Sequence, residues 1–235
     1  TGLRKSQVDA TENFAIATKG ISRVPADIYF RIFQLKAEAK SLQLNKIMAT
    51  HDKTKESIEL IRDDHNDQSK ALQIAEEYST AYQIVEEYAS LVMCLLDDAY
   101  RKDFVRRKNT WQASFAGLIR RHNNVAVTKI PPAVNNIASR IIMELGKIPV
   151  NQLQKKYLKQ AIQTARIPFE NICDDFIRLD SLKIKGELNN LPAYINNNYA
   201  NFLENIRAVE KLGNNPYTYF REYTPLYLGW LTQID

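Results

Sequence analysis

Three clusters of aspartates are the residues whose type and spacing could support chemistry. They lie at residues 63–67, at residues 97–103 and at residues 174–180. Carboxylates one, three or four residues apart on a helix can share a face and hold Mg²⁺, which prefers oxygen ligands and keeps waters that bridge to a phosphate. The candidate metal ligands are Asp63, Asp97, Asp98, Asp174 and Asp175. The simpler interpretation, which we favour, is that these carboxylates cap helices, face solvent or pair with neighbouring Arg and Lys.

A basic segment follows the second aspartate cluster. Residues 52–98 hold four basic and twelve acidic residues, a net charge of −8, whereas residues 101–122 hold seven basic and one acidic residue, a net charge of +6. The candidate binding surface here consists of Arg106, Arg107, Lys108, Trp111, Arg120 and Arg121. Such a mixture of basic and aromatic residues could contact nucleic acid, an acidic lipid surface or a protein. Because Trp111, Phe115 and Leu118 recur at helical spacing, we favour a core-facing aromatic stripe with the charges in solvent.

The acidic pair and the arginine pair occur together in residues 91–111, where a Leu-Leu-Asp-Asp sequence is followed by Arg-Arg and then a tryptophan. This stretch resembles the first aspartate-rich region of the trans-isoprenyl diphosphate synthases. The resemblance implies that Asp97 and Asp98 bind Mg²⁺ and that Arg106 and Arg107 bind a diphosphate. The chain departs from the family pattern at two places, where an arginine replaces the third aspartate and a lysine replaces the glycine after the arginine pair.

The C-terminal part of the chain is rich in tyrosine and asparagine. Tyr217, Tyr219 and Tyr223 are candidates for a binding surface, because tyrosine offers a large contact area at low entropic cost. The alternative, which we favour, is that the composition is biased here and that the tyrosines are half-buried in a last helix.

Other catalytic patterns are missing from the sequence. The three histidines have neither Glu-x-x-His nor His-x-x-x-His spacing, and neither a phosphate-binding glycine loop nor a Gly-x-Ser-x-Gly motif occurs. Cys94 and Cys173 have no neighbouring histidine and lie in apolar surroundings, so we expect buried free thiols in a reducing compartment such as the cytoplasm. We therefore expect no cofactor and lean toward a protein that is not an enzyme.

The elements that would position these residues are predicted to be helices. Between Pro25 and Gly117 the chain contains neither Gly nor Pro, and apolar residues recur there at spacings of three and four. The predicted helices cover residues 25–48, 54–104, 133–145, 151–166, 169–185, 194–212 and 217–231, with an extended segment at 123–132 and with Pro149, Pro168, Pro192 and Pro216 at boundaries. Residues 71–80 and 81–90 form a tandem near-repeat, and each copy contains Glu-Glu-Tyr.

These patterns predict an all-α fold, a helical bundle built around long antiparallel helices with little or no β structure. We expect a long-helix half at residues 1–122 and a short-helix half at residues 123–235, packed as one domain. The longest apolar run, residues 91–96, is far too short for a transmembrane segment.

The function expected from this architecture is that of a helical binding or scaffolding protein. It would mediate protein–protein interaction or self-association through coiled-coil contacts of its long helices. Two alternatives remain: a Mg²⁺-dependent, diphosphate-handling helical enzyme, and a nucleic-acid-binding protein that uses the basic segment at residues 101–122.

Overall fold

The computed structural model describes residues 5–50, 55–145, 150–211 and 225. Side chains are described in these ranges except at residues 41–50, 55–68, 71, 98, 99, 103, 150–155, 179–181 and 205–211. Every regular element in the described part is helical and no strand occurs there, which confirms the all-α prediction. None of the helices in the described part combines the length and the apolar character that a bilayer-spanning segment needs.

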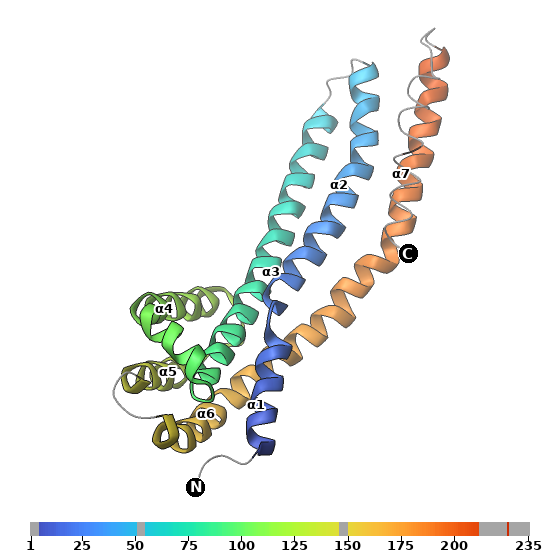
Figure 1. Ribbon diagram of the computed structural model, residues 1–235. Helices are drawn as coiled ribbons and strands as arrows, with labels where there is room; N and C mark the ends of the chain where they lie inside the picture. Colours follow the sequence, from blue (N-terminus) through green and yellow to red (C-terminus); the bar gives the residue numbers. More distant parts are fainter. Residues whose placement is uncertain (1–4, 51–54, 146–149, 212–224, 226–235) are drawn as a thin grey trace. The chain divides into compact units, whose positions relative to one another are not determined.

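The helices follow one another with short connections (Figure 1). They are α1 (Lys5–Thr18), the 3-10 turn η1 (Ile21–Arg23), α2 (Val24–Thr50), α3 (Lys55–Met93), α4 (Asp98–Val125), α5 (Pro132–Leu145), α6 (Val150–Leu179), the π-helical turn η2 (Asp180–Ile184) and α7 (Lys185–Lys211). Helices α2 and α5 each begin one residue before their predicted starts. The residues between α4 and α5 lie within the predicted extended segment.

The chain divides into two compact units, each made of two separate stretches. Unit 1 consists of Thr1–Ala26 and Ala75–Ile177, and unit 2 consists of Asp27–Ile74 and Arg178–Asp235. The boundary expected at residues 122 and 123 lies inside unit 1, within α4. The packing of residues 1–122 and 123–235 as one domain stays a prediction.

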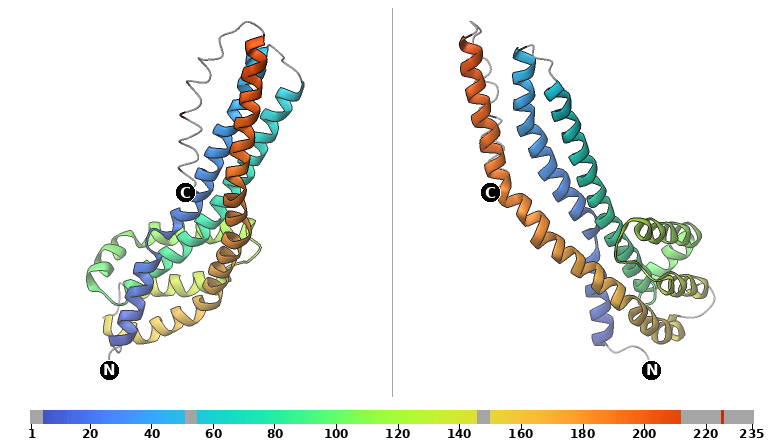
Figure 2. Two further views of the ribbon diagram at one scale, coloured as in Figure 1. Left: turned by 90° about the vertical axis from the view of Figure 1, so that its right-hand side faces the viewer. Right: turned by 180° about the vertical axis from the view of Figure 1, so that it is seen from behind.

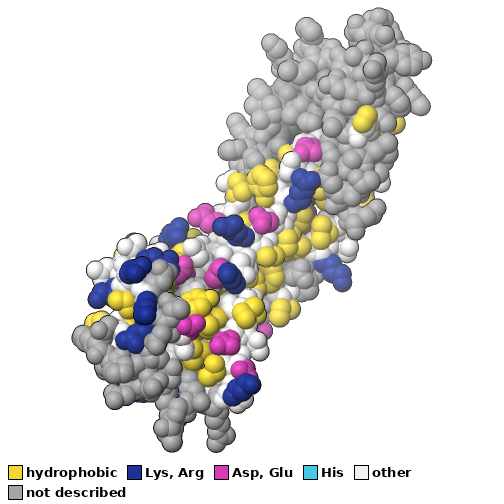
Figure 3. Space-filling view, in the orientation of Figure 1, with side chains coloured by type: hydrophobic (Ala, Val, Ile, Leu, Met, Phe, Trp, Pro, Cys, Tyr) yellow, Lys and Arg dark blue, Asp and Glu magenta, His cyan; other side chains and the backbone are white. Residues whose placement is uncertain are grey.

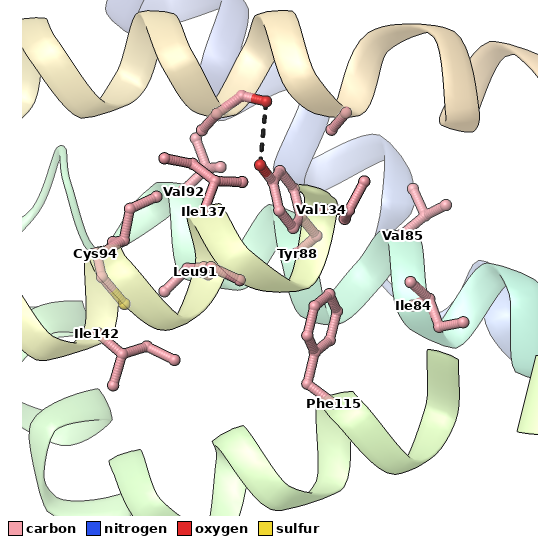
Figure 4. Packing of buried hydrophobic residues seen from close by; sticks show 14 of the residues in the cluster. Ile84, Val85, Tyr88, Leu91, Val92, Cys94, Phe115, Val134, Ile137 and Ile142 are labelled. Carbon is pink, nitrogen blue, oxygen red and sulfur yellow. Dashed lines mark hydrogen bonds between the residues drawn. The ribbon is translucent and has the colours of Figure 1, made fainter. Parts of the chain in front are cut away.

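The core of unit 1 is one continuous cluster from α3, α4, α5 and α6 (Figure 4). Tyr88 of α3 lies at its centre, where its ring meets the ring of Phe169 edge-on at 5.1 Å between centroids. The Tyr88 hydroxyl donates a hydrogen bond to the carbonyl oxygen of Ala161 at 3.0 Å, which satisfies the one polar group of this buried side chain. Trp111 stacks on Phe115 at 4.6 Å between centroids, so the predicted aromatic stripe of α4 does face the core.

Unit 2 contains long antiparallel helices. In this unit α2 and the first part of α3 run side by side in opposite directions (Figures 1 and 2). Helix α7 packs on α2 through a small buried cluster in which Leu35 and Ala39 meet Leu191, Ile195 and Phe202. Long antiparallel helices are therefore present, whereas coiled-coil packing between them stays a prediction.

The helix predicted over residues 54–104 is interrupted. Helix α3 ends at Met93, and residues 94–97 form a turn in which the amide of Asp97 donates to the carbonyl of Met93 at 3.1 Å. Five consecutive residues, 91–95, are all buried. A single face of one helix cannot bury five residues in a row, because successive side chains point about 100° apart. The chain turns here, and α4 packs its aromatic stripe onto the end of α3.

Two prolines lie inside helices, where boundaries were predicted. Pro168 lies within α6 and Pro192 within α7. An interior proline costs a helix about 3 kcal/mol because it removes a backbone hydrogen bond and crowds the preceding turn. Phe169 follows Pro168 directly and Ile172 lies one helical turn further on; both are buried in the core of unit 1, and their burial offsets that cost. Tertiary packing thus outweighs the preference of proline for a helix boundary. The other two predicted boundary prolines, Pro149 and Pro216, lie outside the described residues.

Candidate binding cleft

An apolar cleft of about 660 Å³ opens in unit 1 between α1, α3 and α6. Its walls are Ala10, Thr11, Phe14 and Thr18 of α1, Ile21 of η1, Tyr82, Val85, Tyr88 and Val92 of α3, and Ile162, Ala165, Arg166, Phe169, Glu170, Cys173 and Asp174 of α6. Their spacings of three and four place each set on one face of its helix. The cleft has the size of ligand pockets, which enclose about 300–1,000 Å³.

The α1 wall is held in place by one carboxylate of α3. Glu86 accepts a hydrogen bond from the amide of Gly20 at 2.9 Å and another from the hydroxyl of Ser22 at 2.8 Å. Gly20 has a φ of +79°, a left-handed conformation that glycine adopts without steric cost. The next residue, Glu87, accepts a hydrogen bond from the indole nitrogen of Trp111 at 2.5 Å. The acidic pair in the second copy of the near-repeat therefore joins α3 to two other segments.

Three titratable side chains of the cleft have raised pKa values. Burial raises the pKa of the Tyr82 and Tyr88 hydroxyls, so both stay neutral. Partial desolvation and, secondarily, the Asp174 carboxylate raise the pKa of the Cys173 thiol, which keeps it in its less nucleophilic form at neutral pH. Cys173 is nevertheless exposed, contrary to prediction, whereas Cys94 is buried as predicted; both are free thiols.

The predicted metal ligands fall into two groups. Asp97, Asp174 and Asp175 have described side chains, and Asp175 accepts a hydrogen bond from the Thr128 hydroxyl at 2.7 Å. The side chains of Asp63 and Asp98 lie outside the described residues. Among the side chains that are described, no three His, Cys, Asp or Glu residues converge in a way that could hold a metal ion. Magnesium binding by these aspartates stays a prediction.

A buried histidine fixes the connection between α4 and α5. The Nε2 atom of His122 lies 2.9 Å from the carbonyl oxygen of Thr128, and its Nδ1 atom is buried without a hydrogen-bond partner. Burial lowers the pKa of this histidine, so it is neutral and Nε2 is the donor. Next to it, the Asn123 side chain bonds both the amide and the carbonyl of Ile130. Sequence analysis missed this arrangement, because its partners are backbone atoms of an irregular segment.

Basic side chains gather over α4 on the face shown in Figure 3. The predicted surface residues Arg106, Arg107, Lys108, Arg120 and Arg121 are all exposed. Trp111 is buried, with 9% of its surface exposed, so this predicted member of the binding surface is unavailable to a partner. Tyr217, Tyr219 and Tyr223 lie outside the described residues.

Comparisons with known protein families, curated proteins and solved structures return no match for this chain. The geometry of the molecule is therefore the basis for assigning a function. Sequence analysis missed the apolar cleft because it predicted no helix at residues 5–18. Gly2 and Gly20 bracket that helix, but its buried positions include Thr11 and Thr18 rather than large apolar residues, which leaves the helical pattern weak.

Proposed function

We propose that this protein is a helical binding module whose cleft between α1, α3 and α6 receives an amphipathic helix of a partner protein. The observation that carries the proposal is the apolar cleft itself, which leaves large apolar side chains open to solvent. Phe14 is 39% exposed and Ile162 is 49% exposed although both line it. Complete burial of a fully exposed side chain of this size contributes about 1.5–3 kcal/mol, and covering these half-exposed side chains contributes a part of that.

The shape of the exposed apolar surface favours a helical partner. On α6, Ile162, Phe169, Cys173 and Ile177 recur at spacings that place them along one face, and Ile177 is 64% exposed. This stripe extends beyond the cleft and spans about 22 Å at 1.5 Å per residue. An amphipathic helix that lies in a groove presents its anchors over a comparable length, at positions i, i+3, i+4 and i+7. A compact small molecule would leave the end of the stripe uncovered.

Two isoleucines of α6 allow a matched test. Ile162 lines the cleft, whereas Ile167 is 66% exposed and does not line it. A fluorescein-labelled amphipathic peptide of Leu and Lys serves as the probe, and its anisotropy is followed against the wild type, Ile162→Asp and Ile167→Asp. We expect Ile162→Asp to weaken binding at least tenfold and Ile167→Asp to change it less than twofold. Equal affinities for the three proteins would overturn the proposal.

A second measurement separates a partner protein from a second copy of this chain. Sedimentation equilibrium is run on the wild type and on Ile162→Asp. We expect the same mass for both at all concentrations. A concentration-dependent dimer that Ile162→Asp abolishes would identify a second copy as the occupant and contradict the proposed partner.

A second candidate function, nucleic-acid binding, is favoured by the charge of α4 and α5. Residues 104–143 contain no acidic residue and seven basic ones. Arg106, Arg120 and Arg121 lie on the side of α4 opposite to Phe115, where they can contact phosphate groups. Since the aromatic residues of α4 are buried, such binding would use the phosphate backbone and not base stacking.

Salt dependence and charge reversal test this second candidate. A labelled DNA duplex is titrated with the wild type, Arg120→Glu/Arg121→Glu and, as a control on α6, Lys159→Glu. We expect the slope of log K against log[salt] to be about −0.9 per phosphate contacted, and only the α4 variant to reduce its magnitude. A flat salt response of the wild type would exclude this candidate.

A further inference from the structure

A second concave site lies in unit 2, and its walls carry an excess of positive charge. The groove encloses about 610 Å³ between α2, α3 and α7, next to the π-helical turn η2. Among the residues whose side chains are described, its lining includes four lysines and one acidic residue, Glu187. Lys36 and Lys40 come from α2, Lys70 from α3 and Lys183 from η2. Three different segments thus place cations around one cavity.

Only part of this charge is neutralised within the groove. Lys36 forms an ion pair with Glu187, and its ammonium group lies 5.8 Å from the centroid of the Tyr194 ring. Lys70 and Lys183 are exposed, and neither takes part in an ion pair among the described residues. The groove therefore offers the ammonium groups of Lys70 and Lys183 to an incoming anion. Lys36 lies beside them and is held by its ion pair with Glu187.

Apart from Asn190, the other described walls of the groove are apolar or aromatic. Phe33, Ile74 and Tyr194 line it, and Leu182 of the π-helical turn is 71% exposed at its edge. Gly186 also lines the groove, and a Cβ atom built there would meet nothing within 4 Å. The π-helical turn is a further indication, because such turns are frequently found at functional sites. An anion without an apolar part would leave these apolar and aromatic walls uncovered.

We propose that the groove of unit 2 binds a small organic anion, in which an oxyanion group such as phosphate or sulfonate is joined to an aromatic or aliphatic body. The oxyanion pairs with Lys70 and Lys183, and the body covers Tyr194 and the apolar wall. This site is independent of the proposed helix-binding cleft, since none of its lining residues belongs to unit 1.

The test compares a charged probe with an uncharged probe of the same shape. Anilinonaphthalene sulfonate and its uncharged analogue N-phenylnaphthylamine are titrated by fluorescence against the wild type and Lys70→Gln/Lys183→Gln. We expect the double variant to bind the sulfonate at least tenfold more weakly and the uncharged analogue within twofold of the wild type. Arg120→Gln/Arg121→Gln, which removes two cations from α4, should leave both affinities unchanged. An unchanged sulfonate affinity in the lysine variant would overturn the proposal.

A blocking variant tests the location of the bound body. Because the space beside Gly186 is open, Gly186→Leu fits without a clash at its Cβ and fills part of the groove. We expect it to weaken both probes at least fivefold, whereas Ile162→Asp in the cleft of unit 1 should leave the sulfonate affinity unchanged. Circular dichroism and the melting temperature establish that each variant is folded. A sulfonate affinity that falls with Ile162→Asp but not with Gly186→Leu would move the site to unit 1 and contradict the proposal.

Free anions and membrane surfaces are distinguished by displacement. Dodecyl phosphate below its micellar concentration should displace the sulfonate probe, because one molecule of it carries both the oxyanion and the apolar body. Displacement by phosphatidylserine vesicles alone would assign the lysines to a lipid surface and overturn the proposal.

Discussion

The cleft of unit 1 and the groove of unit 2 have similar sizes and opposite chemistry. Each opens between three helices, with a volume of about 660 Å³ in unit 1 and about 610 Å³ in unit 2. Among the described residues, the cleft is lined by one basic and two acidic residues, and its Arg166 pairs with Glu170 on the same helix. The described lining of the groove contains four lysines and one glutamate. Helix packing creates both cavities, while a few side chains decide which ligand each one suits.

The two sites also differ in how their walls are held. The cleft borders on the large core of unit 1, and Tyr88 belongs to both. In the part of unit 2 whose side chains are described, the groove borders on a cluster of five buried residues, and Tyr194 is only half-buried against it. We therefore expect substitutions in the walls of the cleft to cost more stability than equivalent substitutions in the groove.

The largest expected effect comes from removing one tyrosine of each site. Tyr88→Ala should lower the free energy of unfolding by about 3–5 kcal/mol, because it empties a buried aromatic position. Tyr194→Ala should cost clearly less, since part of that ring is exposed. Urea denaturation followed by circular dichroism measures both, and in a Trp230→Phe background the fluorescence of Trp111 reports separately on unit 1. Tyr88→Phe is the control and should cost about 1 kcal/mol through the lost hydrogen bond. Equal losses for the two alanine variants would remove the proposed difference between the sites.

A smaller effect is expected from the carboxylate that holds α1. Glu86→Ala removes the acceptor for the Gly20 amide and the Ser22 hydroxyl, and a hydrogen bond to a charged group contributes about 1.5–3 kcal/mol. Hydrogen exchange of residues 5–22 should accelerate by roughly 30-fold for a loss of about 2 kcal/mol. Glu76→Ala is the matched control, because Glu76 occupies the same position in the first copy of the near-repeat. Equal acceleration in both variants would show that Glu86 does not dock α1.

Substituting alanine for either of two glycines should change the stability of the protein in opposite directions. Gly20→Ala should destabilise the protein by about 1–2 kcal/mol, because an L side chain at a φ of +79° is strained. Gly186→Ala should stabilise it by about 0.5–1 kcal/mol, since Gly186 lies in helix α7 with open space around its Cβ position. Thermal and urea denaturation measure both changes. A stabilising Gly20→Ala would contradict the turn geometry that places the α1 wall.

The smallest expected effect concerns pH and distinguishes unit 1 from unit 2. Burial is the main cause that lowers the pKa of His122, and the charge of Lys129 lowers it further. The hydrogen bond to the Thr128 carbonyl and the charges of Glu77 and Asp175 act in the opposite direction. The unfolded chain therefore takes up a proton near pH 6.5, before the folded protein does, and stability falls as pH drops from about 6.5 toward 5. The loss cannot exceed about 1.4 kcal/mol per pH unit.

Replacement of the histidine tests this pH dependence. His122→Gln should flatten the dependence of unfolding free energy on pH between about 7 and 5, as measured by urea denaturation at each pH. His65→Gln serves as the control. Between about pH 7 and 5, its unfolding free energy should depend on pH more steeply than that of His122→Gln. The same slope in His122→Gln and the wild type would show that His122 does not account for it.

Helical periodicity predicted several features correctly, because they depend on neighbouring residues. The start of α2 at Val24 follows from the proline that suits a first helical turn, and the inward face of α4 follows from the spacing of Trp111, Phe115 and Leu118. The break after Met93 was missed, although the apolar run at residues 91–95 contains a signal for it. Such a run is too wide for one helix face, and it indicates burial on several sides.

The candidate sites could not be predicted, because each combines residues far apart in the chain. Tyr82 and Cys173 both line the cleft across a sequence separation of 91 (173 − 82), and Lys36 meets Glu187 across a separation of 151. Pro168 is a further case, in which the local preference for a helix boundary is outweighed by buried neighbours.

The amino-acid sequence by itself determined that this protein is helical, where most of its long helices lie and which stretches are acidic or basic. These properties follow from periodicity and composition, which act over a few turns of helix. Only the tertiary structure decided that Glu86 and Glu87 dock other segments, that Trp111 is buried, and that a cleft and a lysine-lined groove exist. The physical reason is that cavities and ion pairs between helices depend on which faces pack together, and that choice minimises exposed apolar surface over each whole unit.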